Sequence, residues 1–172
     1  FAERGYACYA LSVSGHGGSP GREHLDSFGL DHYVSDVAAV VEQLPAPPVL
    51  VGHSMGGMVA QKYLESHEAA GLVLLASVPP QGLWAAALGL AFQKPGVMSD
   101  LNSLLGGGRV ALDTLRSAMF AQPVTTEDLA RWYKRMQPES HRAIWDMTLF
   151  NLPLKSRMTL PPLLVLGAEH DT

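Results

Sequence analysis

Short apolar blocks alternate with stretches of helical spacing through the first half of the chain. Tyr6–Val13 and Gly71–Ser77 are apolar almost throughout, and each has the length of a buried strand. A third block, Val49–Val51, is short and mostly β-branched. Between Tyr6–Val13 and Val49–Val51, apolar residues at helical spacing predict a helix over residues 32–44, with Asp31 as its N-cap. Strands that alternate with helices in this way are typical of a parallel sheet covered on both faces.

The alternation stops in the second half of the chain. Helical spacing with short breaks predicts four further helices, which cover residues 83–93, 110–121, 125–136 and 138–150. Thr125 begins a stretch that resembles a capping box, and Pro138 suits the first turn of the last helix. A strand returns at Leu160–Gly167.

This change of pattern divides the chain into two parts. We expect residues 1–80 and 159–172 to form an α/β core around a mostly parallel sheet. Residues 81–158 would form a helical cap inserted between two strands of that sheet.

Composition excludes several functional classes. The chain has 172 residues, 47% of them hydrophobic, which suits one globular domain. Its net charge of −4 argues against a nucleic-acid partner. The single cysteine, Cys8, excludes a disulfide framework, and its place in an apolar block predicts burial. No apolar run reaches the roughly 20 residues of a transmembrane helix, and no zinc-type spacing is present, so we expect a cytoplasmic protein without a metal.

The strongest chemical signal lies directly after the block Val49–Val51. It is the run Gly52-His53-Ser54-Met55-Gly56-Gly57, followed at once by a helix-compatible segment. A G-x-S-x-G pattern between a strand and a helix predicts a sharp elbow that presents the serine hydroxyl. We expect Ser54 in a strained backbone region, and glycine at 52 and 56 because a Cβ there would collide as strand and helix fold back. His53 would be a packing residue.

Three stretches together resemble the α/β-hydrolases of the serine esterase and lipase type. They are the elbow Gly52–Gly57, the loop Gly15–Ser19 and the terminal segment Leu164–Asp171. The elbow and the loop are similar to those of monoacylglycerol lipases and lysophospholipases. They occur equally in other esterases, in haloperoxidase-like members and in carbon–carbon bond hydrolases, so the subfamily stays open.

The resemblance implies hydrolysis of a carboxylic ester with an apolar or lipid-like acyl group, without a metal or organic cofactor. Ser54 would be the nucleophile, and the backbone N–H of Met55 one donor of the oxyanion hole. Asp171 matches the acid that orients the catalytic histidine, with Glu169 as its rival. In the order of such triads the histidine follows the acid. The sequence ends at Thr172, so we expect a fragment that is incomplete at both termini and inactive by itself.

Other interpretations stay open at this point. A member of this fold with a degraded triad could bind a ligand without catalysis, and haloperoxidase-like or acyltransferase chemistry could use the same elbow. Of the histidines present, His16 in the glycine-rich loop and His170 beside Asp171 are the nearest substitutes for the missing base, and we expect neither to act. The sequence does not determine the substrate's identity or the oligomeric state.

Overall fold

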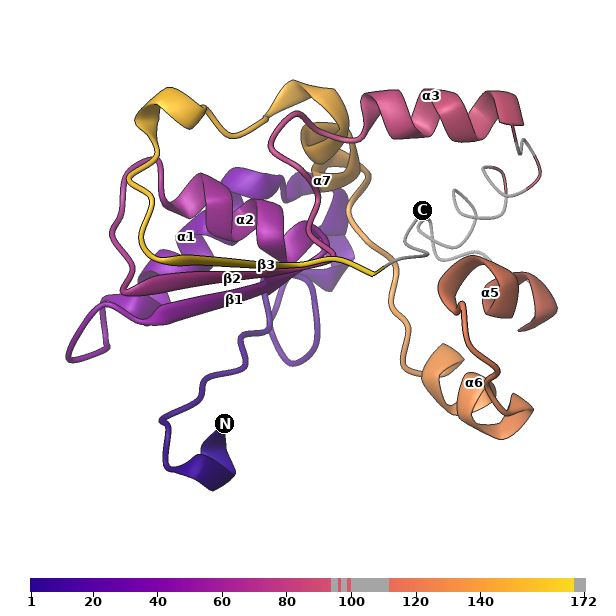
Figure 1. Ribbon diagram of the computed structural model, residues 1–172, viewed down its shortest axis with the longest axis horizontal. Helices are drawn as coiled ribbons and strands as arrows, with labels where there is room; N and C mark the ends of the chain where they lie inside the picture. The colour runs from indigo at the N-terminus through magenta and orange to yellow at the C-terminus, as the bar shows by residue number, and fades with distance from the viewer. Residues whose placement is uncertain (94–95, 97–98, 100–111, 169–172) are drawn as a thin grey trace.

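The strands of a parallel sheet lie side by side, and helical segments connect them along the chain, as Figure 1 shows for the computed structural model. The structure describes the chain except residues 94–95, 97–98, 100–111 and 169–172. Its strands are β1 (Val49–His53), β2 (Gly71–Leu75) and β3 (Leu163–Leu166). Its helices of eight or more residues are α1 (Leu30–Val41), α2 (Met55–Tyr63), α3 (Trp84–Gln93), α5 (Leu112–Met119) and α6 (Thr126–Tyr133). Shorter helical segments are η1 (Ala2–Arg4), η2 (Arg22–Ser27), α7 (His141–Trp145), the π-helical turn η3 (Asp146–Phe150) and η4 (Lys155–Arg157).

The strands run parallel in the order β1-β2-β3. The β1-α2-β2 unit follows the predicted alternation, so the predicted α/β class and parallel sheet are confirmed. In parallel strands all carboxyl ends lie at one edge of the sheet, where the connecting loops can build a site.

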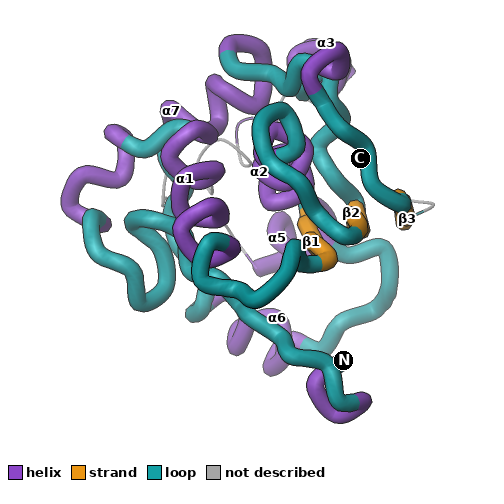
Figure 2. Tube along the Cα trace, turned by 90° about the vertical axis from the view of Figure 1, so that its left-hand side faces the viewer, coloured by secondary structure: helices purple, strands orange, loops and turns teal. Residues whose placement is uncertain are grey.

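Helices α1 and α2 cover one face of the sheet (Figures 1 and 2). The even-numbered residues of β2, Leu72 and Leu74, are buried against Tyr63 of α2 and Leu64, which directly follows the helix. A second core cluster joins α1 and α2 to the α7–η3 segment, with these buried members: Leu30, Tyr33, Met58, Val59, Val78, Ala143 and Met147. The helices between β2 and β3 therefore share a core with the sheet domain at α7 and η3.

The opposite face of the sheet is largely open in the described chain. Side chains alternate between faces along a strand, so Val49, Val51 and His53 of β1 point away from α2. Val49 is 58% exposed and Val51 is 55% exposed. In Figure 1 the N-terminal segment, with η1, lies on this side of the sheet.

The predicted strand at Tyr6–Val13 is wrong for the described structure. The segment has no regular secondary structure, and Tyr6 and Tyr9 are each 66% exposed. Cys8, predicted to be buried, is exposed as well. An apolar run becomes a strand only when a neighbouring strand takes up its N–H and C=O groups, and within the described residues the sheet holds β1, β2 and β3 alone.

Two helix starts also differ from the prediction: a distant carboxylate caps α1, and α7 has Ser140, two residues after the predicted Pro138, as its local N-cap. Helix α1 begins at Leu30 with Gly29 as its N-cap, and the N–H of Leu30 donates to Asp146 Oδ2 at 3.0 Å. Helix α7 begins after Ser140, whose Oγ accepts from the N–H of Ala143 at 3.2 Å. The predicted starts at Asp31 and Pro138 used only local signals.

The start of α6 is confirmed. Thr125 is its N-cap, and Thr125 Oγ1 accepts from the N–H of Asp128 at 3.1 Å. This cap is local, since donor and acceptor are three residues apart, and a local pattern was enough to find it.

The division into core and cap stays a prediction. The segment between β2 and β3 is helical where it is described, yet several of its large apolar side chains are not packed inside. Trp84 is 51% exposed, Phe92 is 81% exposed and Trp145 is 57% exposed, whereas Met147 is buried. Across the described helices, none combines the length and the apolar character that crossing a membrane requires.

Candidate functional site

The elbow predicted at Ser54 is present. Strand β1 ends at His53, helix α2 begins at Met55, and Ser54 alone forms the link. Its backbone has φ 51° and ψ −122°, a conformation that L-residues avoid. Such a residue costs on the order of 1–3 kcal/mol and persists only where its surroundings hold it in place.

Both backbone polar groups of Ser54 are engaged. Its N–H donates to the carbonyl of Leu75 in β2 at 3.1 Å. Its carbonyl accepts from the N–H of Gly57 at 3.0 Å and from the N–H of Val78 at 3.1 Å. The N–H of Ser54 is therefore occupied by the sheet and is not available to a ligand.

Two glycines permit the close approach of β1 and α2, but they are not the predicted pair. A Cβ at Gly52 would lie 2.5 Å from the carbonyl oxygen of Gly56 and 2.6 Å from Cα of Gly57. A Cβ at Gly57 would lie 2.1 Å from Ser77 Oγ. At Gly56, which is exposed, an added Cβ meets no atom within 4 Å in the described structure, so the predicted collision there is wrong. Gly56 lies in the first turn of α2, where an added Cβ would point into open space.

The Ser54 side chain is exposed at the carboxyl edge of the sheet. Met55 is the first residue of α2, so its N–H has no carbonyl of the same helix to bond, and the positive end of the helix dipole lies beside it. These two features place a hydroxyl next to a backbone donor. His53, predicted to pack inside, is exposed, because it is on the open face of β1.

Gln61 is a residue of this region that the sequence analysis missed. It is 3% exposed, and its side-chain Nε2 lies within hydrogen-bonding distance of three oxygens beneath the elbow. A polar residue between Ala60 and Lys62, four positions after Gly57 on the helix, was the available signal.

His16 is turned toward α1 and the segment before α7. Its Nε2 lies 3.3 Å from Glu139 Oε2, and its Nδ1 lies 3.1 Å from the carbonyl oxygen of Ser14. Its ring meets Tyr33 edge-on at 5.9 Å between centroids. Among the described residues no interaction joins His16 to Ser54, and the expectation that His16 is not the base stays a prediction.

Tyr33 completes this buried polar group. Its hydroxyl donates to Glu139 Oε1 at 2.9 Å, and the side chain is fully buried. Burial, followed by the negative charge of Glu139, raises the pKa of Tyr33 well above its ordinary value. Tyr33 therefore stays a neutral hydrogen-bond donor, and the group fixes the loop at His16 to the segment before α7.

The predicted acid Asp171, its rival Glu169 and His170 lie outside the described residues. The strand that leads to them is described. Leu166 of β3 pairs with Leu75 of β2, and its carbonyl accepts from the N–H of Ala76 at 2.8 Å. Strand β3 thus ends at the same edge of the sheet as Ser54.

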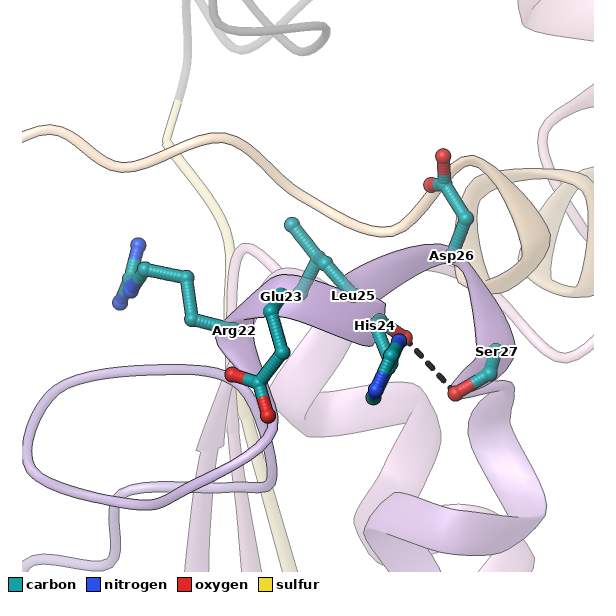
Figure 3. A pocket seen from close by; sticks show the side chains of 6 residues that line it. All are labelled: Arg22, Glu23, His24, Leu25, Asp26 and Ser27. Atoms are coloured by element: carbon teal, nitrogen blue, oxygen red, sulfur yellow. Dashed lines mark hydrogen bonds between the residues drawn. The ribbon is translucent and has the colours of Figure 1, made fainter.

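A surface cavity of about 400 Å³ lies elsewhere, at η2. Figure 3 shows its lining, which is drawn from one short segment: Arg22, Glu23, His24, Leu25, Asp26 and Ser27. The hydroxyl of Ser27 donates to the carbonyl of His24 at 2.7 Å (Figure 3). None of the elbow residues lines this cavity, and we assign it no role.

Comparison with known proteins agrees with this geometry. A family model described as the alpha/beta hydrolase family matches residues 1–172. A non-heme haloperoxidase from Rhodococcus erythropolis is 42% identical over 82 residues, which are 45% of this chain and 29% of the relative. A bifunctional esterase/perhydrolase from Acinetobacter calcoaceticus is 39% identical over 84 residues, which are 46% of this chain and 30% of the relative. The chain spans about 30% of the length of these curated relatives.

A solved structure shows the same fold. It is an extracellular α/β-hydrolase from a Paenibacillus species, with a TM-score of 0.67 and 14% identity, and the match covers 99% of this chain and 82% of that one. At this identity the likeness concerns the fold alone.

Proposed function

This chain belongs to the alpha/beta hydrolase family, and from that premise we propose that the protein hydrolyses carboxylic esters through an acyl-enzyme on Ser54. The backbone of Ser54 carries the proposal. Its positive φ, between a parallel strand and a helix start, presents an exposed hydroxyl beside the N–H of Met55. This is the strand–elbow–helix context that gives a G-x-S-x-G pattern its chemical meaning.

The proposed reaction has two steps. Ser54 Oγ attacks the ester carbonyl while a histidine takes its proton, and the N–H of Met55 stabilises the oxyanion that forms. The alcohol leaves with that proton, and water then releases the acid from the acylated serine. We propose Asp171 as the residue that orients the histidine, and we place the histidine after it, in the chain order nucleophile, acid, histidine.

We further propose that residues 81–158 form the part that receives the acyl group. Exposed Trp84, Phe92 and Trp145 favour an apolar acyl chain over a charged one. The name of the Acinetobacter relative, an esterase/perhydrolase, supports an ester as the substrate class.

A second candidate function follows from the names of the curated relatives, which include a haloperoxidase and a perhydrolase. If hydrogen peroxide instead of water attacks the acylated Ser54, the products are free serine and a peroxy acid. The elbow is the same in both cases, so the two candidates differ only in the second step.

Labelling of the full-length protein with a fluorophosphonate probe tests the proposal. We expect the probe to modify Ser54, and we expect Ser54→Ala to abolish labelling and to lower the turnover of p-nitrophenyl esters by several orders of magnitude. Ser35→Ala is the matched control, since Ser35 is an exposed serine on α1 whose hydroxyl bonds its own helix. Turnover with added hydrogen peroxide separates hydrolysis from peroxy-acid formation.

Two outcomes would overturn the proposal. Labelling that persists in Ser54→Ala would place the nucleophile elsewhere. A wild-type protein that binds esters but is neither labelled nor active would be a ligand-binding member of the fold.

A further inference from the structure

We propose that Gln61 is a positioning residue for Ser54, acting through Gly57 and Val78, the two residues whose N–H groups hold the carbonyl of Ser54. The inference rests on the proposed role of Ser54 as nucleophile and adds a residue to that site. Gln61 has no direct contact with the Ser54 hydroxyl in the described structure; its carboxamide lies beneath the elbow.

Gln61 donates from a buried site. It lies in α2, seven residues after Ser54, and only 3% of its surface is exposed. Its Nε2 lies 3.2 Å from the carbonyl oxygen of Gly57, 3.1 Å from Ser77 Oγ and 3.0 Å from the carbonyl oxygen of Val78. The carboxamide thus joins the first turn of α2 to the segment that follows β2.

The same two residues that accept from Gln61 also donate to Ser54. The N–H groups of Gly57 and Val78 both bond the carbonyl of Ser54, at 3.0 and 3.1 Å. One carboxamide therefore bonds the carbonyls of the same two residues whose N–H groups hold the carbonyl of Ser54. Ser77 Oγ belongs to the same hydrogen-bonded group, since it accepts from Gln61 and donates to the carbonyl of Val78 at 3.0 Å.

Backbone strain explains why such a support is needed. Ser54 has φ 51° and Ala76 has φ 39°, and these are the non-glycine residues with positive φ in the described chain. They lie at the two segments that Gln61 connects. Strained residues persist only where surrounding contacts over-determine them, and a displacement of about 1 Å at a reacting group can lower a rate on the order of 100-fold.

If Gln61 had a purely structural role, its loss would leave the labelling rate of Ser54 unchanged. The positioning role predicts a slower rate in a protein that still folds. Gly57 O keeps its helical bond from the N–H of Gln61, and Val78 O keeps its bond from Ser77 Oγ, when the carboxamide is removed. The fold is then expected to survive the loss of Nε2, and the position of Ser54 is expected to change.

The decisive variant is Gln61→Met, which keeps an unbranched side chain of similar length and removes the donor. In the full-length protein we expect the rate constant for fluorophosphonate labelling to fall roughly 10- to 100-fold, while the final stoichiometry stays at one label per chain. For ester turnover we expect kcat to fall by a similar factor and KM to stay unchanged. Gln43→Met is the matched control, because Gln43 follows the end of α1, is exposed, and donates from Nε2 to the carbonyl of Ala39 four residues earlier. It should leave both values unchanged.

The outcomes separate this inference from the proposed function. If Gln61→Met is labelled at the wild-type rate, or at that rate with reduced stoichiometry, Gln61 only packs and the inference is wrong. If Ser54→Ala is still labelled, the proposed function itself fails. Should Gln61→Met not fold, Ser77→Ala takes its place: it removes one acceptor of the same group and should slow labelling several-fold, and an unchanged rate would overturn the inference.

Discussion

The elbow at Ser54 and the polar contact between residues 14–33 and 137–146, called here the loop–α7 joint, are built in different ways. Backbone sterics make the elbow, because Gly52 and Gly57 have no room for a Cβ, and its supports lie within 25 residues of one another in the sequence. Side chains make the joint, and they come from positions 106 to 123 residues apart. The elbow can therefore be inferred from a short pattern, whereas the joint exists only once the chain has folded.

The joint consists of several separate hydrogen bonds. Gln137 Oε1 accepts from the N–H of Gly17 and from Arg22, and Ser140 Oγ donates to the carbonyl of Phe28 at 2.6 Å. Each contact is an ordinary hydrogen bond, so we expect single losses in the joint to be tolerated better than a Cβ in the elbow.

The largest effect should follow from breaking the elbow with Gly52→Ala. The added methyl would lie 2.5 Å from one backbone oxygen of α2, and backbone cannot move aside as a flexible side chain can. We expect a loss of about 3 kcal/mol or more in the free energy of unfolding, measured by urea titration, together with loss of fluorophosphonate labelling.

Gly56→Ala is the control for that variant. With no neighbour within 4 Å of the new Cβ in the described structure, we expect unchanged labelling and a stability unchanged or higher by up to about 1 kcal/mol. Equal damage from both substitutions would mean that the approach of β1 and α2 does not require Gly52.

A smaller effect is expected from Ser140→Ala in the joint. Ser140 is fully buried, and its loss leaves the carbonyl of Phe28 and the N–H of Ala143 without their partner. We expect a loss of about 1–3 kcal/mol in the free energy of unfolding. Thr125→Ala removes an N-cap of the same kind from α6, where the bond is exposed, and should cost about 1 kcal/mol or less. A larger loss of unfolding free energy from Thr125→Ala than from Ser140→Ala would mean that Ser140 in the joint stabilises the fold less than an exposed helix cap does.

The smallest effect should come from the exposed end of the joint, where Asp26 meets His141. The N–H of His141 donates to Asp26 Oδ1 at 2.8 Å, and this bond, followed by the His141 side chain, lowers the pKa of Asp26. A lowered pKa in the folded state adds stability above the unfolded pKa of about 3.9, and this stability is lost as the pH falls through the folded pKa.

Melting temperatures of the wild type and of Asp26→Asn between neutral and acidic pH test this. We expect Asp26→Asn to lower the melting temperature slightly near neutrality and the difference to shrink as the pH falls through the lowered pKa of Asp26. A difference that grows toward acid would mean that the Asp26 carboxylate destabilises the fold. Because Asp26 is exposed, solvent screening keeps the effect small.

Much of the elbow could be predicted from the sequence, and the exceptions have local causes. The strand, the turn at Ser54 and the following helix were all predicted, and the family match confirms the resemblance on which the fold class rested. The role assigned to Gly56 was wrong because the pattern shows which residues are glycine and not which of them meets the sheet. His53 was predicted to pack inside, and only the strand's alternation in the folded sheet shows that it points to the open face.

The sequence by itself determined the βα alternation, the strained serine and the N-cap at Thr125, because each depends on groups only a few residues apart. Tertiary structure alone decided that Tyr6–Val13 pairs with no described strand, that α1 begins at Leu30 under Asp146, and that Gln61 reaches the supports of Ser54. Each of these depends on which distant donor meets which acceptor. A hydrogen bond has a range of about 3 Å, and the distance between two groups along the chain does not predict their distance in space.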